Sequence, residues 1–147
     1  LCHLFLGEEW SNWRYVVDPL IYSFPFPIKE FKRIKANLKH PIGYPLEHNI
    51  PHVDWLEDDW LDGTGFVGIY YVNDSDGSTI LFEEYINSVD EVEREGWWAS
   101  ELNVEKKISP KKGTMIIFNA SRIHAAAHPV EFSNRCLINF NFKIANG

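Results

Sequence analysis

Runs of apolar and β-branched residues, separated by turn residues, dominate the second half of the chain. Five such runs predict β-strands, at 65–72, 78–84, 102–108, 113–119 and 135–144. The stretch "NDSDGS" at 73–78 predicts a hairpin turn, and "SPKKG" at 109–113 carries Pro and Gly between two strand runs. Many short strands with such punctuation are typical of a β-sandwich or barrel.

The first third of the chain gives a mixed signal. The spacing of three, three and four residues from Ile28 to Leu38 suits an amphipathic helix. Ile34, Ala36 and Leu38 alternate with polar residues as they would in a strand. The periodicity therefore leaves helix and strand open for this segment.

The segment 84–102 is too polar and irregular for a core strand, and it predicts a long, partly helical excursion from the sheet. Trp97 and Trp98 follow Gly96 directly, which suits a segment that closes over a substrate. The other interpretation is that one tryptophan plugs the end of the core.

Composition limits the class of protein. A chain of 147 residues with 45% hydrophobic content fits one domain with its own core. Two cysteines are too few for a disulfide framework, and the opening "LCHLFL" is too short to span a membrane and lacks signal-peptide features. We therefore expect a cytoplasmic protein without membrane attachment. The net charge of −7 argues against a nucleic-acid partner, because binding phosphates needs a surplus of Lys and Arg.

Candidate metal ligands occur in two stretches. In "NIPHVDW", His52 and Asp54 are two residues apart, so an extended chain projects both side chains from one face. In "FNASRIHAAAHPVEFSNRCLINF", His124 and His128 lie between two strand signals and precede Arg135. Two imidazoles and one carboxylate can occupy one face of an iron(II) octahedron and leave three positions open.

With these motifs the sequence resembles the iron(II)- and 2-oxoglutarate-dependent oxygenase superfamily. The resemblance covers roughly residues 31–144 and is closest to the prolyl-hydroxylase-like branch and its small phage and marine-microbial members. It is carried in order by "RIKANL", "PHVD", "IYYVNDSDGSTILF", "SPKKGTMIIFN", a histidine and "NRCLINFNF". The resemblance implies a mainly β fold, the double-stranded β-helix or jelly roll, with one or two short flanking helices. It also implies that residues 1–147 form a single oxygenase domain.

The resemblance assigns the iron ligands, which are also the catalytic residues, to His52, Asp54 and His124. Relatives place the second histidine roughly nine to thirteen residues before the basic residue. His124 fits at eleven residues before Arg135, whereas His128 is seven residues before it. His128 is followed by Pro129, which suits a turn better than ligation.

The resemblance also assigns a 2-oxoglutarate pocket. Arg135 would bind the distal carboxylate of 2-oxoglutarate through a charge-assisted fork. Tyr71 matches a position whose hydroxyl binds the same carboxylate. Asn139, on the strand face of Arg135, and Asn37 are further candidates for this pocket.

The activity that the resemblance implies is a 2-oxoglutarate-dependent dioxygenase, a hydroxylase that uses iron(II), 2-oxoglutarate and O2. It would hydroxylate a protein side chain or a small molecule and release succinate and CO2. Its binding partner would accordingly be a small-molecule or peptide substrate.

Two other classes of protein stay open at this point. A non-catalytic jelly-roll binding module could use the six tryptophans as stacking platforms. A zinc-binding protein could pair His48 with His52 and His124 with His128 at helical spacing. Pro51 and Pro129 argue against helices at these two places.

Overall fold

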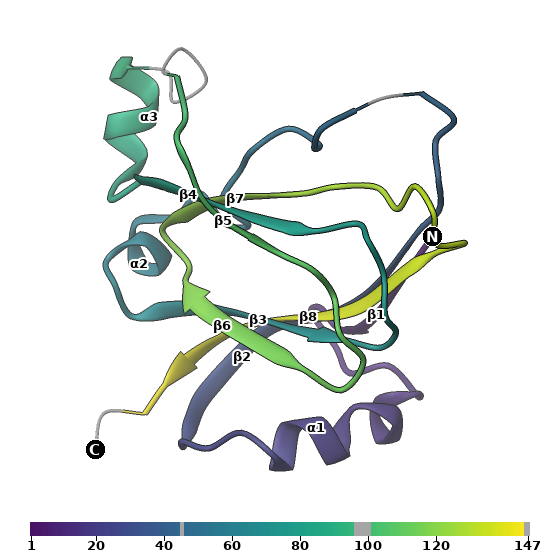
Figure 1. Ribbon diagram of the computed structural model, residues 1–147. Helices are drawn as coiled ribbons and strands as arrows, with labels where there is room; N and C mark the ends of the chain where they lie inside the picture. Colours follow the sequence, from purple (N-terminus) through teal and green to yellow (C-terminus); the bar gives the residue numbers. More distant parts are fainter. Residues whose placement is uncertain (45, 96–100, 146–147) are drawn as a thin grey trace.

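The structure, a computed structural model, describes residues 1–44, 46–95 and 101–145 (Figure 1). Five antiparallel strands form the larger sheet in the order β1-β2-β8-β3-β6, and three form the smaller sheet in the order β5-β4-β7. The strands are β1 (Cys2–Leu6), β2 (Ile28–Lys39), β3 (Gly65–Tyr71), β4 (Thr79–Tyr85), β5 (Val104–Ile108), β6 (Met115–Asn119), β7 (Arg122–Ala126) and β8 (Arg135–Ile144). The helices are a 3-10 turn, η1 (Arg14–Val16), and the short α1 (Asp18–Tyr22), α2 (Asp58–Leu61) and α3 (Val89–Glu95).

The alternation of side chains along each strand divides the apolar residues into three clusters. Inward-facing residues of both sheets, such as Val67, Leu81 and Leu137, form the core between the sheets. The outer face of the larger sheet, with Phe140 and Phe142, is covered by α1 and the chain around it. The outer face of the smaller sheet packs against α2 and α3. This arrangement confirms the expected jelly roll with short flanking helices.

The segment that gave a mixed signal is strand β2. Its register with β8 shifts twice, between Ile28 and Glu30 and between Phe31 and Arg33. Each β-bulge adds one residue, so side chains three apart reach the same face. Ile28, Phe31 and Ile34 consequently all pack into the outer cluster despite their helix-like spacing.

The predicted strands of the second half are confirmed, with one correction to their connections. The turn at 73–78 is not a hairpin, because β3 belongs to the larger sheet and β4 to the smaller one. The turn instead carries the chain from one sheet to the other. The sequence signals missed β1 and β7, both only five residues long.

The excursion at 84–102 is partly helical, as expected, because it contains α3. Trp97 and Trp98 lie outside the described residues. In the part of the chain that the structure describes, no helix is long and apolar enough to cross a membrane.

Candidate metal centre and cavity

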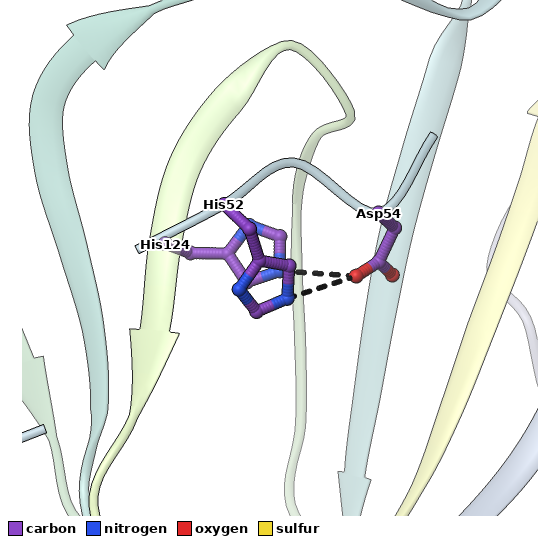
Figure 2. A group of neighbouring side chains, drawn as sticks. All are labelled: His52, Asp54 and His124. Atoms are coloured by element: carbon purple, nitrogen blue, oxygen red, sulfur yellow. Dashed lines mark ion pairs between the residues drawn. The ribbon is translucent and has the colours of Figure 1, made fainter. Parts of the chain in front are cut away.

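A single pair of backbone hydrogen bonds brings two histidines together. His52 follows the long connection after β2, and His124 lies in β7. Each donates its amide N–H to the carbonyl of the other at 2.9 Å, so His52 extends the smaller sheet by one residue. Their imidazole centroids are 4.6 Å apart, and both rings face Asp54 (Figure 2).

Backbone carbonyls fix the orientation of both imidazoles. The Nδ1 atom of His52 lies 3.0 Å from the carbonyl of Ile50, and that of His124 lies 3.0 Å from the carbonyl of Arg122. Because a carbonyl only accepts, each Nδ1 carries a proton, which leaves Nε2 as the nitrogen that can bind a metal ion. Both Nε2 atoms point to Asp54 Oδ1, at 3.4 and 3.3 Å.

The two oxygens of Asp54 have separate partners. Oδ2 accepts hydrogen bonds from the side-chain amides of Asn139 at 3.1 Å and Asn141 at 2.7 Å. Oδ1 faces only the imidazoles among the described residues. Burial raises the pKa of Asp54, but hydrogen bonds with His124, His52 and Asn141 outweigh it, so the pKa lies well below its ordinary value. The carboxylate is therefore charged and available to a cation.

These three side chains fit a metal ion. One ligand atom from each of His52, Asp54 and His124 lies within 4.8 Å of the others. Ligands bound at about 2.0–2.2 Å on neighbouring positions of one ion lie about 3 Å apart, close to the separations seen here. Two neutral imidazoles and one carboxylate match the facial set that binds iron(II). The hydrogen bonds to both Nδ1 atoms and to Oδ2 are the supporting contacts that metal ligands need.

The other candidate histidines do not join this group. His128 Nδ1 lies 2.9 Å from the carbonyl of His40. His48 Nδ1 contacts the carbonyl of Asn49, and its ring packs against Phe82. A four-histidine zinc site is therefore not assembled in the described structure.

A cavity of about 310 Å³ adjoins the three ligands and runs between the sheets toward β8. Arg135 lies in its wall, and only 2% of this residue is exposed. The guanidinium donates to the carbonyl of Gly77 and to Thr79 Oγ1. Among the described residues it has no carboxylate partner, and a buried cation without a counter-ion is unfavourable unless a ligand supplies one. The cavity is thus suited to an anion.

The turn at 73–78 holds Arg135 in place. The Asp76 carboxylate accepts backbone N–H groups from Val130 and Glu131, which ties the loop before β8 to this turn. Gly77 lies so close that a Cβ there would approach the Arg135 side chain to 2.9 Å. A glycine is needed here for its small size.

The remaining predicted pocket residues occupy different places. Asn37 lines the cavity from β2. The hydroxyl of Tyr71 is fully buried and donates to Thr79 Oγ1 at 2.8 Å, so Tyr71 supports the residue beside Arg135. Asn139 lines the cavity but donates to Asp54, at the metal end rather than beside Arg135.

Sequence reasoning missed two residues of the site. Asn141 makes the shorter of the two amide hydrogen bonds to Asp54, and Thr79 receives hydrogen bonds from both Arg135 and Tyr71. Asn141 had a signal, since "NFNF" places two amides on one face of an otherwise apolar strand. Thr79 had none, because threonine is common in strands.

Comparison with known proteins gives a fold but no sequence family. No protein-family model and no curated protein sequence matches the chain. Solved structures do match. An N-substituted L-amino acid dioxygenase from Burkholderia ambifaria has a TM-score of 0.53 and 15% identity, over 80% of this chain and 54% of that chain. A non-heme α-ketoglutarate-dependent epimerase from nogalamycin biosynthesis has a TM-score of 0.61 and 15% identity, over 90% of this chain and 57% of that one.

A prolyl-4-hydroxylase from Pseudomonas putida has a TM-score of 0.52 and 14% identity, over 99% of this chain and 72% of that chain. At such identities the likeness shows the fold, which this chain shares with these oxygenases and the epimerase. The chain spans about half the length of the first two proteins.

Proposed function

We propose that the protein is an iron(II)- and 2-oxoglutarate-dependent oxygenase, and that residues 1–147 act as a single catalytic domain. One observation carries the proposal: two imidazoles and a carboxylate converge at one end of a cavity whose wall also holds a buried arginine without a carboxylate partner among the described residues. A hydrolytic zinc site accounts for the ligands without requiring the arginine, and a binding module requires neither, whereas the proposed oxygenase uses both.

In this proposal His52, Asp54 and His124 hold the iron, and Arg135 binds the distal carboxylate of 2-oxoglutarate. The bound metal and cosubstrate supply the oxidising power by reaction with O2, with succinate and CO2 as products. The protein positions the metal ligands and places a positive charge where the cosubstrate's distal carboxylate would bind. Backbone carbonyls keep both Nε2 atoms free, and Thr79 and Gly77 aim the guanidinium into the cavity.

We further propose hydroxylation as the reaction and the prolyl-hydroxylase-like branch as the family. Support comes from the sequence motifs and from the shared fold with the Pseudomonas putida prolyl-4-hydroxylase. The substrate would be a small molecule or a peptide side chain at the mouth of the cavity, within reach of the metal.

Anaerobic titration with iron(II) and 2-oxoglutarate tests the proposal. The visible charge-transfer band of an iron-chelated keto acid should form with the wild-type protein. His52→Ala, Asp54→Ala and His124→Ala should each abolish the band, because each variant loses a ligand. His128→Ala is the matched control and should keep it, since His128 contacts the backbone of His40. Absence of the band in the folded wild-type protein would refute the proposal.

A further inference from the structure

The inner face of β2 places a row of basic residues along the cavity. Alternation along the strand directs Arg33, Lys35, Asn37 and Lys39 inward. Among the described residues, four basic residues line the cavity when Arg135 is included, and Asp54 is its only acidic residue. The concentration of cations contrasts with the net charge of −7 of the whole chain.

Two of these basic residues, Arg33 and Arg135, already have interaction partners in the structure. Arg33 contacts Asn141 Oδ1 at 3.1 Å and Asp54 Oδ2 at 3.4 Å. Arg135 donates hydrogen bonds to the Gly77 carbonyl and Thr79 Oγ1, and in the proposed function it also binds 2-oxoglutarate. In contrast, neither Lys35 nor Lys39 makes a hydrogen bond or ion pair with any residue that the structure describes.

Metal and cosubstrate do not remove the excess of positive charge. Four basic residues against one carboxylate leave a surplus of three positive charges. Iron(II) and the 2-oxoglutarate dianion carry equal and opposite charges, so binding both leaves this surplus unchanged. A further anion bound beside the two lysines would offset this surplus.

The two lysines lie at different points along the β2 wall of the cavity. In the β2–β8 register Lys35 is opposite Asn139 at the metal end, and Lys39 is opposite Arg135. Asn139 Oδ1 is buried without a hydrogen-bond partner among the described residues, so it can accept from a donor group of a ligand but not from its anionic group. Lys39 is half-buried, and burial together with the charge of Arg135 lowers its pKa.

Beyond the lysines the cavity opens into a largely apolar groove. Lys35, Asn37 and Lys39 line both the cavity and an adjoining surface depression. This depression shares Pro41, Ile42 and His128 with a pocket of about 630 Å³. The walls of this pocket also include Tyr44, Leu46 and Val130, together with Glu47, whose carboxylate accepts a hydrogen bond from Lys107.

We propose that the primary substrate is an organic acid whose anionic group binds between Lys35 and Lys39, while its apolar part lies along this groove. The inference rests on the proposed function and specifies its substrate class. The rival role for the two lysines is to bind 2-oxoglutarate together with Arg135.

The test compares octanoate with its neutral and cationic analogues octanamide and octylammonium. Calorimetric titration is done under nitrogen with wild-type protein saturated with iron(II) and 2-oxoglutarate. Octanoate should bind at least about tenfold more tightly than octanamide, and octylammonium should bind more weakly than both. Equal affinities for octanoate and octanamide, or displacement of octanoate by excess 2-oxoglutarate, would overturn the inference.

Variants then locate the anion site. Lys35→Met and Lys39→Met should each weaken octanoate binding about tenfold, leave octanamide unchanged and keep the iron–keto acid band. Lys35→Arg should retain binding because it keeps the charge. Lys29→Met is the matched control, since Lys29 lies in the same strand but is exposed and outside the cavity lining. Unaltered octanoate affinity in both methionine variants would place the anion elsewhere.

The two proposals fail in different ways. Loss of the iron–keto acid band in the wild type would count against the oxygenase, and the octanoate comparison could still be made on metal-free protein. A normal band with no preference for octanoate would count against the acidic substrate alone.

Discussion

At the scale of single residues, the site depends on how the two oxygens of Asp54 are divided between partners. Asn139 and Asn141 occupy Oδ2, which leaves Oδ1 directed at the imidazoles. A carboxylate with both oxygens free could rotate and present either one. The two amides thus select one orientation before any cation arrives.

We predict that Asn141→Ala weakens iron(II) binding about 10- to 100-fold, the usual effect of losing a supporting contact to a metal ligand. Asn139→Ala should act in the same direction, with a smaller effect because its hydrogen bond is longer, 3.1 against 2.7 Å. Competition with a chelator of known affinity measures the change. Asn134→Ala is the control, because Asn134 contacts Asn73 rather than the site. Wild-type affinity in both site variants would contradict the orienting role.

Arg135→Ala should weaken 2-oxoglutarate binding by about 2 to 5 kcal/mol, typical of removing one partner from a buried charged pair. Iron binding should persist, because the guanidinium contacts Gly77 and Thr79 rather than a proposed ligand. The charge-transfer band, titrated with 2-oxoglutarate at saturating iron, reports the loss. Unchanged affinity would place the cosubstrate elsewhere.

The sequence predicted those site residues whose side chains can bind a metal ion or an anion. Imidazole, carboxylate and guanidinium groups are recognisable one by one, and His52, Asp54, His124 and Arg135 do lie around one cavity. Asn141 and Thr79 act only through tertiary contacts that bring strands of distant sequence together. Such contacts cannot be derived from local spacing.

At the scale of elements, the turn at 73–78 and the loop before β8 act as one support for Arg135. Burial raises the pKa of Asp76, but the backbone N–H groups of Glu131, Val130 and Phe132 lower it by more. The net pKa is below the ordinary value of 3.8. The carboxylate form therefore stabilises the link between turn and loop.

Asp76→Asn should destabilise the protein in a pH-dependent way. In the unfolded chain Asp76 has the ordinary pKa of 3.8, whereas its pKa in the folded protein is lower. The charged carboxylate therefore stabilises the folded protein fully at pH values above 3.8. This stabilisation is lost as the pH falls through the lower, folded-state pKa. Denaturant unfolding of wild type and variant should differ at pH 6 and converge in strong acid.

The same substitution should weaken 2-oxoglutarate binding at neutral pH, because the loop no longer holds Arg135. Asp62→Asn is the matched control. Asp62 also has a lowered pKa, from the hydroxyl and amide of Thr64, but it lies outside the cavity lining. The Asp62→Asn variant should be less stable than the wild type at pH 6 and equally stable in strong acid, and it should keep the wild-type affinity for 2-oxoglutarate.

Strand predictions succeeded where the alternation was regular and failed where the backbone departs from it. The run at 135–144 matches β8 residue for residue. In β2 two bulges shift the alternation, so that a strand imitates the period of a helix. In β7 the run "RIHAA" is short and rich in alanine, which favours helix rather than strand.

At the scale of the whole molecule, the proposed metal connects the two sheets. His124 belongs to the smaller sheet, and Asp54 is hydrogen-bonded to β8 in the larger one. An ion bound by both holds the sheets together at the cavity. Unfolding would have to release it.

Iron(II) at 100 times its dissociation constant should therefore stabilise the wild-type protein by about 2.7 kcal/mol. For a chain of this size that is a rise in Tm of about 5 to 10 °C. Anaerobic thermal scans measure it, and a chelator should reverse it. Asp54→Ala should show no rise, and an equal rise in that variant would mean that the ion binds elsewhere.

The position of β8 also determines when the site can form during protein synthesis. β8 pairs with β2 on one side and β3 on the other, so a strand made after the other seven described strands is central in the larger sheet. A nascent chain that ends at Ala126 already contains His52, Asp54 and His124, but not Asn141, which lies 87 residues after Asp54. Because chains emerge from the ribosome N-terminus first, the larger sheet stays open between β2 and β3 until β8 emerges. The proposed metal ligands therefore gain their orienting amides only when β8 has been made, and termination before β8 would yield a chain with all three ligands but without the amides that orient Asp54.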